Sequence, residues 1–230
     1  MGAPDRRGGS VAERVLFGHP RFYRLKFFLI ETVIWRWIFA GIFRRRVNPV
    51  PVIDDLIRGK HVLLAACGPG DVSTGPALDA AAAVTAFDLS EEFVLACRRR
   101  RPTWDVFQGN ILAIARPDKS HDLAALYSSL HHIPAEAERV LAELARVTRE
   151  RIVILEGVLP ETGLLRGALR VWYRAFDGGL RYYTQRELLA AAERLGLVVE
   201  RVSVHGPIGH MLLAVLAVPP TAATGPSQDR

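Results

Sequence analysis

The segment HVLLAACGPGD, residues 61–71, joins a short apolar run directly to a turn rich in glycine. This combination is typical of a buried strand that ends in a tight turn. Similar apolar runs recur at residues 84–87, 104–107, 123–127 and 151–155. Between them we predict helices from the turn through Ala83, from Ser90 to Arg101, and over residues 134–149. Strands that alternate with helices predict a parallel sheet with helices on both faces.

The C-terminal part predicts one more helix and two more strands. Thr184, with Glu187 three residues later, forms the capping-box pattern at the start of a helix over residues 184–195. Apolar segments at 197–204 and 210–218 predict a hairpin that turns through Gly206 and Pro207. Residues 159–183 are less regular. The domain is therefore expected to cover residues 51–218, with a disordered tail at 219–230.

Composition and charge indicate a globular protein and exclude several other classes. The chain has 230 residues, of which 50% are hydrophobic and 23% are charged, a typical globular balance. Its two cysteines, Cys67 and Cys97, are too few for a disulfide framework or a zinc site, so we expect packing residues in a reducing compartment and no metal. The net charge of +6 comes from the first 60 residues, with 12 Lys and Arg against 5 Asp and Glu. A nucleic-acid groove is therefore not predicted.

Residues 1–50 form a basic and apolar extension that we expect to be helical. The apolar run at 27–43 contains Glu31 and Arg36 and lies between basic flanks. It is too short and too charged for a membrane span, which needs about 20 apolar residues. Three interpretations stay open: a lid packed over the active-site cleft, a peripheral membrane contact through residues 21–46, and a homodimer interface.

The turn after the first strand, together with an acid after the second, predicts a nucleoside cofactor. Gly68 and Gly70 allow a ligand to approach bare backbone, and Asp88 follows 18 residues after Gly70, at the end of the second strand. A carboxylate in that place can accept both hydroxyls of a ribose. The third glycine of a dinucleotide fingerprint is missing because Ser73 occupies its position, and no P-loop lysine is present.

At this point the chain resembles the class I S-adenosylmethionine-dependent methyltransferases, in particular those that act on small molecules. The resemblance rests on motifs that occur in order: VLLAACGPGD (62–71), VTAFDLSEEFV (84–94), FQGNIL (107–112), LYSSLHHI (126–133) and YYTQRELLAAAERLGL (182–197). It implies an α/β, Rossmann-like, mostly parallel sheet of seven strands whose last strand inserts antiparallel between its neighbours. It also implies S-adenosylmethionine as cofactor. We expect a cytoplasmic enzyme, with membrane association through residues 21–46 left open.

The resemblance assigns cofactor contacts residue by residue. The residues concerned are Ala66, Cys67, Gly68 and Gly70 beside the methionine part, Asp88 at the ribose, Leu89, Asn110 and Ile111 at the adenine, and Tyr127 and Ser128 facing the methionine part. Three positions depart from the family pattern: Leu64 replaces a usual acid, Ala66 replaces a usual glycine, and Asn110 replaces a common Asp. The missing acid removes an anchor for the cofactor's ammonium group.

Other residues are candidates for the acceptor side. His131 and His132 follow the fourth strand, where one of them could act as a general base or both could form the cleft wall. Trp172, Tyr173 and Tyr182 could bind an apolar acceptor or pack against the 27–43 helix. The segment YSSLHH lacks the Asn/Asp-Pro-Pro motif of methylases that act on nucleic-acid bases. We predict methyl transfer to a small hydrophobic acceptor, with oxygen favoured; the alternative is a non-catalytic, cofactor-binding scaffold attached through residues 21–46.

Overall fold

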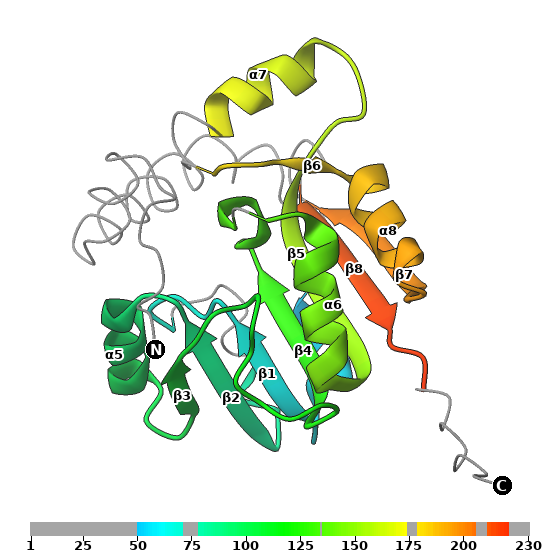
Figure 1. Cartoon of the computed structure of the whole chain (residues 1–230). Coiled ribbons are helices and arrows are strands. Elements are labelled where there is room, and N and C mark those ends of the chain that lie inside the picture. The colour runs from blue at the N-terminus through cyan, green and yellow to red at the C-terminus, as the bar shows by residue number, and fades with distance from the viewer. Residues whose placement is uncertain (1–49, 71–77, 134, 174–178, 206–210, 221–230) are drawn as a thin grey trace, which may run out of the picture.

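The computed structural model describes residues 50–70, 78–133, 135–173, 179–205 and 211–220 (Figure 1). The predicted N-terminal helix over 27–43, the turn at 206–207 and most of the polar tail lie outside the described residues. No helix within the described ranges is long and apolar enough to cross a membrane.

The strands form one mostly parallel sheet, which confirms the predicted fold class. Their bounds are β1 His61–Ala65, β2 Ala83–Asp88, β3 Asp105–Gln108, β4 His121–Tyr127, β5 Thr148–Leu159, β6 Tyr183–Thr184, β7 Val198–His205 and β8 Met211–Ala217. Seven strands lie in the order β3-β2-β1-β4-β5-β8-β7, and the two-residue β6 pairs with β5 outside this path. β8 runs antiparallel to both β5 and β7, so the last strand is inserted between its neighbours as expected.

Helices cover both faces of the sheet and enclose two separate cores (Figure 1). One core lies under α6 (Ala137–Val147) and α8 (Gln185–Arg194), the other under α3 (Val50–Ile57) and α5 (Glu91–Arg100). The caps follow the sequence: Ser90 accepts a hydrogen bond from the Phe93 N–H, and Thr184 forms the predicted capping box with Glu187. Each helix therefore begins where its cap satisfies the first free N–H groups.

Several element boundaries differ from the prediction. Ala83 begins β2 instead of ending a helix, since the chain turns at residues 79–82. Thr148 and Arg149 begin β5 instead of ending α6, because the Thr148 hydroxyl donates to the Leu144 carbonyl and closes the last helical turn. The irregular region contains a helix, α7 (Leu164–Trp172). Strand β5 is longer than predicted because β4, β6 and β8 all pair with it.

Candidate functional site

Three residues of the turn after β1 have left-handed backbone conformations. Ala66, Gly68 and Gly70 have φ angles of 50°, 53° and 74°. The Cys67 N–H donates to the Phe87 carbonyl at 2.9 Å, which holds the turn against the end of β2. A Cβ on Gly70 would lie 2.8 Å from the Cys97 Sγ of α5, so only glycine allows the turn to pack this closely.

Asp88 closes the turn from the end of β2. Its Oδ2 accepts a hydrogen bond from the Gly68 N–H, and its Oδ1 accepts one from the Ser90 N–H, both at 2.9 Å. Burial raises the pKa of the Asp88 carboxyl, although these two N–H groups act in the opposite direction. An ionised carboxylate has about four acceptor positions, so two remain for the hydroxyls of a ribose. The residues present therefore fit a nucleoside beside Asp88.

The predicted adenine residues lie on either side of this carboxylate. The Gly109 N–H donates to the Asp88 carbonyl at 3.0 Å, which brings the end of β3 beside the end of β2. Leu89 is 70% exposed, Asn110 is also exposed, and Ile111 is buried. The Asn110 Oδ1 accepts from the Leu112 N–H at 2.9 Å, which fixes the side chain. The structure thus brings these three residues to the same edge as Asp88.

The two cysteines are free and buried. A hydrogen bond to Cys97, together with burial, raises the pKa of the Cys67 thiol, so this thiol stays protonated at neutral pH. A protonated, buried thiol is a poor nucleophile. This agrees with the interpretation of Cys67 as a packing residue that shapes the turn through its backbone, and Cys97 is fully buried in the core beneath α5.

A second cluster lies at the end of β4, next to the first. Tyr127 is buried, and Ser128 has a φ of 46° while its N–H donates to the Leu155 carbonyl at 2.7 Å. The Ser129 hydroxyl reaches the Ala66 carbonyl at 3.4 Å and connects the two clusters. Between β1 and β4 the strand order reverses, the position where open parallel sheets bind ligands.

Glu156, which the sequence analysis did not single out, organises this second cluster. Its side chain is fully buried on β5. Oε2 accepts from the N–H groups of Ser129 at 3.1 Å and Leu130 at 2.8 Å, and Oε1 accepts from the Gly157 N–H at 3.0 Å and from His131 Nδ1. All four acceptor positions are occupied. The only signal in the sequence was a lone acidic residue inside the apolar run IVILEGVL, residues 152–159.

An aromatic stack extends from His131 toward α7. The rings of His131 and Tyr182 lie 5.1 Å apart, those of Tyr182 and Tyr173 lie 4.7 Å apart, and both pairs are nearly parallel. The His132 ring is tilted against His131 at 4.1 Å. The structure therefore brings four of the five predicted acceptor-side residues together. The fifth, Trp172, belongs to α7, but its side chain lies outside the described residues.

The chain's similarity to known proteins agrees with this geometry. A family model described as a methyltransferase domain matches residues 62–151. The chain is 33% identical over 112 residues to the demethylmenaquinone methyltransferase of Renibacterium salmoninarum. Residues 62–151 are therefore similar to a methyltransferase domain, which supports the family resemblance of the sequence motifs. That alignment covers 48% of this chain and 46% of the relative, so the chain spans about half of the relative's length.

Solved structures of methyltransferases share the fold. A geranyl diphosphate methyltransferase, in complex with GPP and sinefungin, has a TM-score of 0.62 at 17% identity, over 74% of this chain and 78% of that one. Magnesium protoporphyrin IX methyltransferase from Synechocystis PCC 6803, with bound SAH, has a TM-score of 0.58 at 17% identity, over 86% and 99%. The match to a methyltransferase domain supports S-adenosylmethionine as the cofactor.

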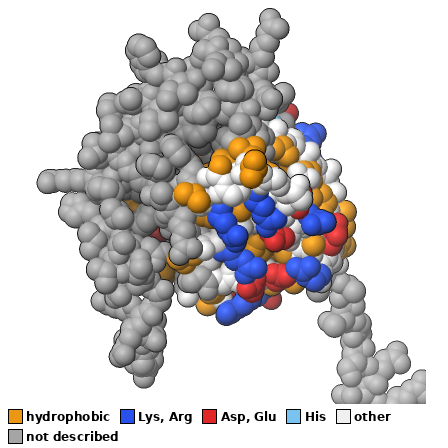
Figure 2. Space-filling model, turned by 90° about the horizontal axis from the view of Figure 1, so that it is seen from above, with side chains coloured by type: hydrophobic (Ala, Val, Ile, Leu, Met, Phe, Trp, Pro, Cys, Tyr) orange, Lys and Arg blue, Asp and Glu red, His pale blue; other side chains and the backbone are white. Residues whose placement is uncertain are grey.

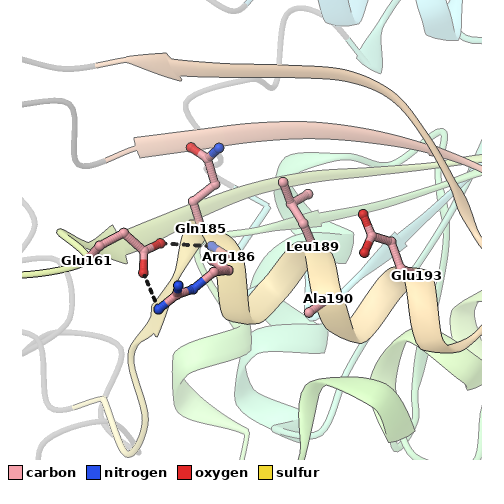
Figure 3. A pocket seen from close by; sticks show the side chains of 6 residues that line it. All are labelled: Glu161, Gln185, Arg186, Leu189, Ala190 and Glu193. Atoms are coloured by element: carbon pink, nitrogen blue, oxygen red, sulfur yellow. Dashed lines mark hydrogen bonds and ion pairs between the residues drawn. The ribbon is translucent and has the colours of Figure 1, made fainter.

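Two features of this methyltransferase domain stand apart from the cofactor contacts. Leu64, at the position of the usual acid, is fully buried in an apolar cluster and offers nothing to an ammonium group. A hollow of about 300 Å³ lies beside α8 (Figure 3). It is lined by Glu161, Gln185, Arg186, Leu189, Ala190 and Glu193. None of the candidate cofactor or acceptor residues lines this hollow.

Proposed function

We propose that the chain transfers a methyl group from S-adenosylmethionine to a small hydrophobic acceptor, with oxygen as the favoured acceptor atom. The proposal rests on the hydrogen bonds of Asp88. Each oxygen of its carboxylate accepts one backbone N–H of the turn, and the two remaining acceptor positions suit the hydroxyls of a ribose. The aromatic stack of His131, Tyr182 and Tyr173 supports an apolar acceptor on the neighbouring side. The three relatives are named for small-molecule acceptors.

The residues of the chain mainly bind and orient the two reactants. Bound S-adenosylmethionine supplies an electrophilic methyl carbon on its sulfonium. Asp88 would hold the ribose, the backbone of residues 66–70 would border the methionine part, and the loop at 127–132 would face the methyl end. The aromatic rings exclude water and align the acceptor, which accounts for much of the rate in a reaction between two bound molecules.

The two histidines have different roles in this proposal. The Glu156 carboxyl accepts three backbone N–H groups, and Nδ1 of His131 forms the fourth hydrogen bond to it. This bond and the stack with Tyr182 fix His131 as part of the cleft wall. His132 is half-buried and lies beside it, where it can remove the proton of an acceptor hydroxyl.

Leu64 favours a second candidate function. Because a buried leucine replaces the acid that would anchor the ammonium group, a non-catalytic protein that binds the cofactor weakly is the alternative. In that case residues 21–46 would attach the domain to a membrane or to a partner. A catalytic protein could use the same residues for peripheral membrane contact or as a lid.

Cofactor binding and turnover test the proposal separately. We expect Asp88→Asn to lower the affinity for S-adenosylhomocysteine about a hundredfold in isothermal titration, because two hydrogen bonds to a charged group are weakened. Asp118→Asn, at an exposed carboxylate, is the matched control and should bind like the wild type. Equal affinity of Asp88→Asn and the wild type would contradict the ribose assignment.

Turnover distinguishes the two candidate functions. Labelled S-adenosylmethionine is incubated with the full chain and with a panel of hydroxylated, apolar acceptors, and organic extracts are analysed by mass spectrometry. A labelled product supports the enzyme. Cofactor binding without product from any acceptor supports the scaffold.

A further inference from the structure

Helix α7 has its apolar face turned away from the protein. With 100° per residue, Leu164, Leu165, Ala168 and Val171 share an arc of about 120°, and Arg166 and Arg170 lie on the opposite side. Leu164 is 96% exposed, Val171 is 70% exposed and Leu165 is 46% exposed. A surface helix normally buries such an apolar face against the core. This exposed face is therefore a candidate contact surface for something outside the described residues.

Both ends of α7 contact other parts of the chain, although its apolar face is exposed. One guanidinium nitrogen of Arg166 donates to the Glu161 carbonyl at 2.7 Å, so this side chain contacts the chain that leads into the helix. At the other end, the Tyr182 hydroxyl donates to the Tyr173 carbonyl at 3.2 Å, and the two rings stack. Figure 1 shows α7 beyond the strand ends, on the side of the sheet away from the C-terminus, and the orientation of its faces is fixed by these contacts.

We propose that α7 lies on the surface of an anionic lipid membrane, with Leu164, Leu165, Ala168 and Val171 inserted among the headgroups. The helix combines a leucine- and valine-bearing face with a polar face that carries only arginines, and its first turn has no acidic residue. This is the composition of helices that bind in the plane of a membrane interface. Figure 2 looks onto this end of the molecule and shows apolar side chains at the surface, beside Lys and Arg with Asp and Glu among them.

Charge favours lipid over an occupant from this chain. A second copy of α7 would supply no carboxylate for Arg166 or Arg170, because the helix contains none and both arginines lie opposite the apolar face. The apolar run at 27–43 is also flanked by basic residues, at 21–26 and at 44–46. Anionic headgroups complement both segments, since each Lys or Arg near such a surface adds about 1 kcal/mol of attraction.

The location of α7 connects the membrane with the acceptor side of the cleft. Tyr173 caps the helix and stacks in the aromatic wall, and a Cβ on Gly157 of β5 would touch its hydroxyl at 3.9 Å. A hydrophobic acceptor dissolved in the bilayer would therefore enter beside Tyr173. This step rests on the proposed function, whereas the lipid contact itself does not.

Vesicle sedimentation of the full chain tests the contact. The probe is a vesicle of phosphatidylcholine and phosphatidylglycerol in a 3:1 ratio. The variant Leu164→Gln with Val171→Gln removes apolar area without adding charge, and we expect its partition coefficient to fall about tenfold. The matched control, Leu95→Gln with Val198→Gln, changes two exposed apolar residues on α5 and β7 and should bind within about twofold of the wild type. Wild-type protein that stays in the supernatant, or an α7 variant that binds as well as the wild type, overturns the proposal.

A label distinguishes lipid from other occupants. Leu164→Cys offers an exposed thiol for an environment-sensitive fluorophore, because Cys67 and Cys97 are buried. We expect a blue shift of the emission when vesicles are added. Emission that is already blue-shifted without vesicles would show that α7 is covered by this chain or by a second copy, and would overturn the proposal. Titration with S-adenosylhomocysteine in the same samples reports the cofactor site separately, so a failure of the proposed function is visible on its own.

Discussion

The turn after β1 and the loop after β4 lie side by side at one edge of the sheet, and each is built around a carboxylate. Asp88 is half-buried and receives one backbone N–H on each oxygen. Glu156 is fully buried and receives two donors on each oxygen. A carboxylate with acceptor positions left can bind a ligand, whereas a saturated one can only support the fold. Counting donors thus separates a binding residue from a structural one.

Of the substitutions considered, we expect those at Glu156 to change the free energy of unfolding most. Glu156→Leu leaves three N–H groups and His131 Nδ1 without their acceptor in the core, and we expect the free energy of unfolding to fall by about 3–5 kcal/mol. Urea denaturation measures the change, and Glu156→Gln should lose less because one oxygen remains. Glu150→Gln on the same strand is the control. Its partly exposed ion pair with Lys60 contributes at most about 1 kcal/mol. A small effect of Glu156→Leu would mean that the loop does not depend on this carboxylate.

The contrast between the two regions explains what the sequence could predict. Asp88 was identifiable because the glycine turn and the end of β2 form one known motif with a fixed spacing. Glu156 was missed because its partners are 25 to 27 residues away, and its strand is otherwise apolar. The strand order and the antiparallel β8 agreed with the family resemblance, while the start of β5 at Thr148 depended on one side-chain hydrogen bond. Helix α7 escaped prediction because its apolar face does not join the core.

A second test concerns the aromatic stack of the β4 side. A Cβ on Gly179 would lie 2.8 Å from His131 Cδ2 and closer still to the Tyr182 hydroxyl. Gly179→Ala should therefore displace the rings and lower the free energy of unfolding by about 1–3 kcal/mol. Gly167→Ala within α7 meets no atom within 4 Å and should raise it by about 0.5–1 kcal/mol. Equal effects of the two substitutions would show that the stack is loose, and near-ultraviolet circular dichroism reports the rings directly.

A third test compares two buried histidines, His121 at the start of β4 and His131 in the loop that follows β4. His131 pairs with Glu156, whereas burial and the positive charges of Arg116 and Arg149 lower the pKa of His121, against the weaker effect of Asp122. A histidine with a lowered pKa binds its proton more readily in the unfolded chain. The free energy of unfolding should therefore fall as the pH drops below about 6.5, with a slope of at most about 1.4 kcal/mol per pH unit. Urea titrations between pH 8 and pH 5 measure this slope, and His121→Gln should reduce it. An unchanged slope in this variant would assign the effect to another group.

The smallest effect is expected at Ala66, where the turn after β1 departs from the family pattern. Its φ of 50° is costly for any residue with a Cβ, by about 1–2 kcal/mol, and the entropy cost of a glycine offsets part of that. Ala66→Gly should raise the free energy of unfolding by about 0.5–1 kcal/mol. Gly68→Ala is the inverse control: no atom lies within 4 Å of its Cβ position, so its expected loss of about 1 kcal/mol comes from the φ of 53° alone. If both substitutions destabilise the protein, the packing of the Ala66 methyl group contributes more to stability than its backbone strain costs.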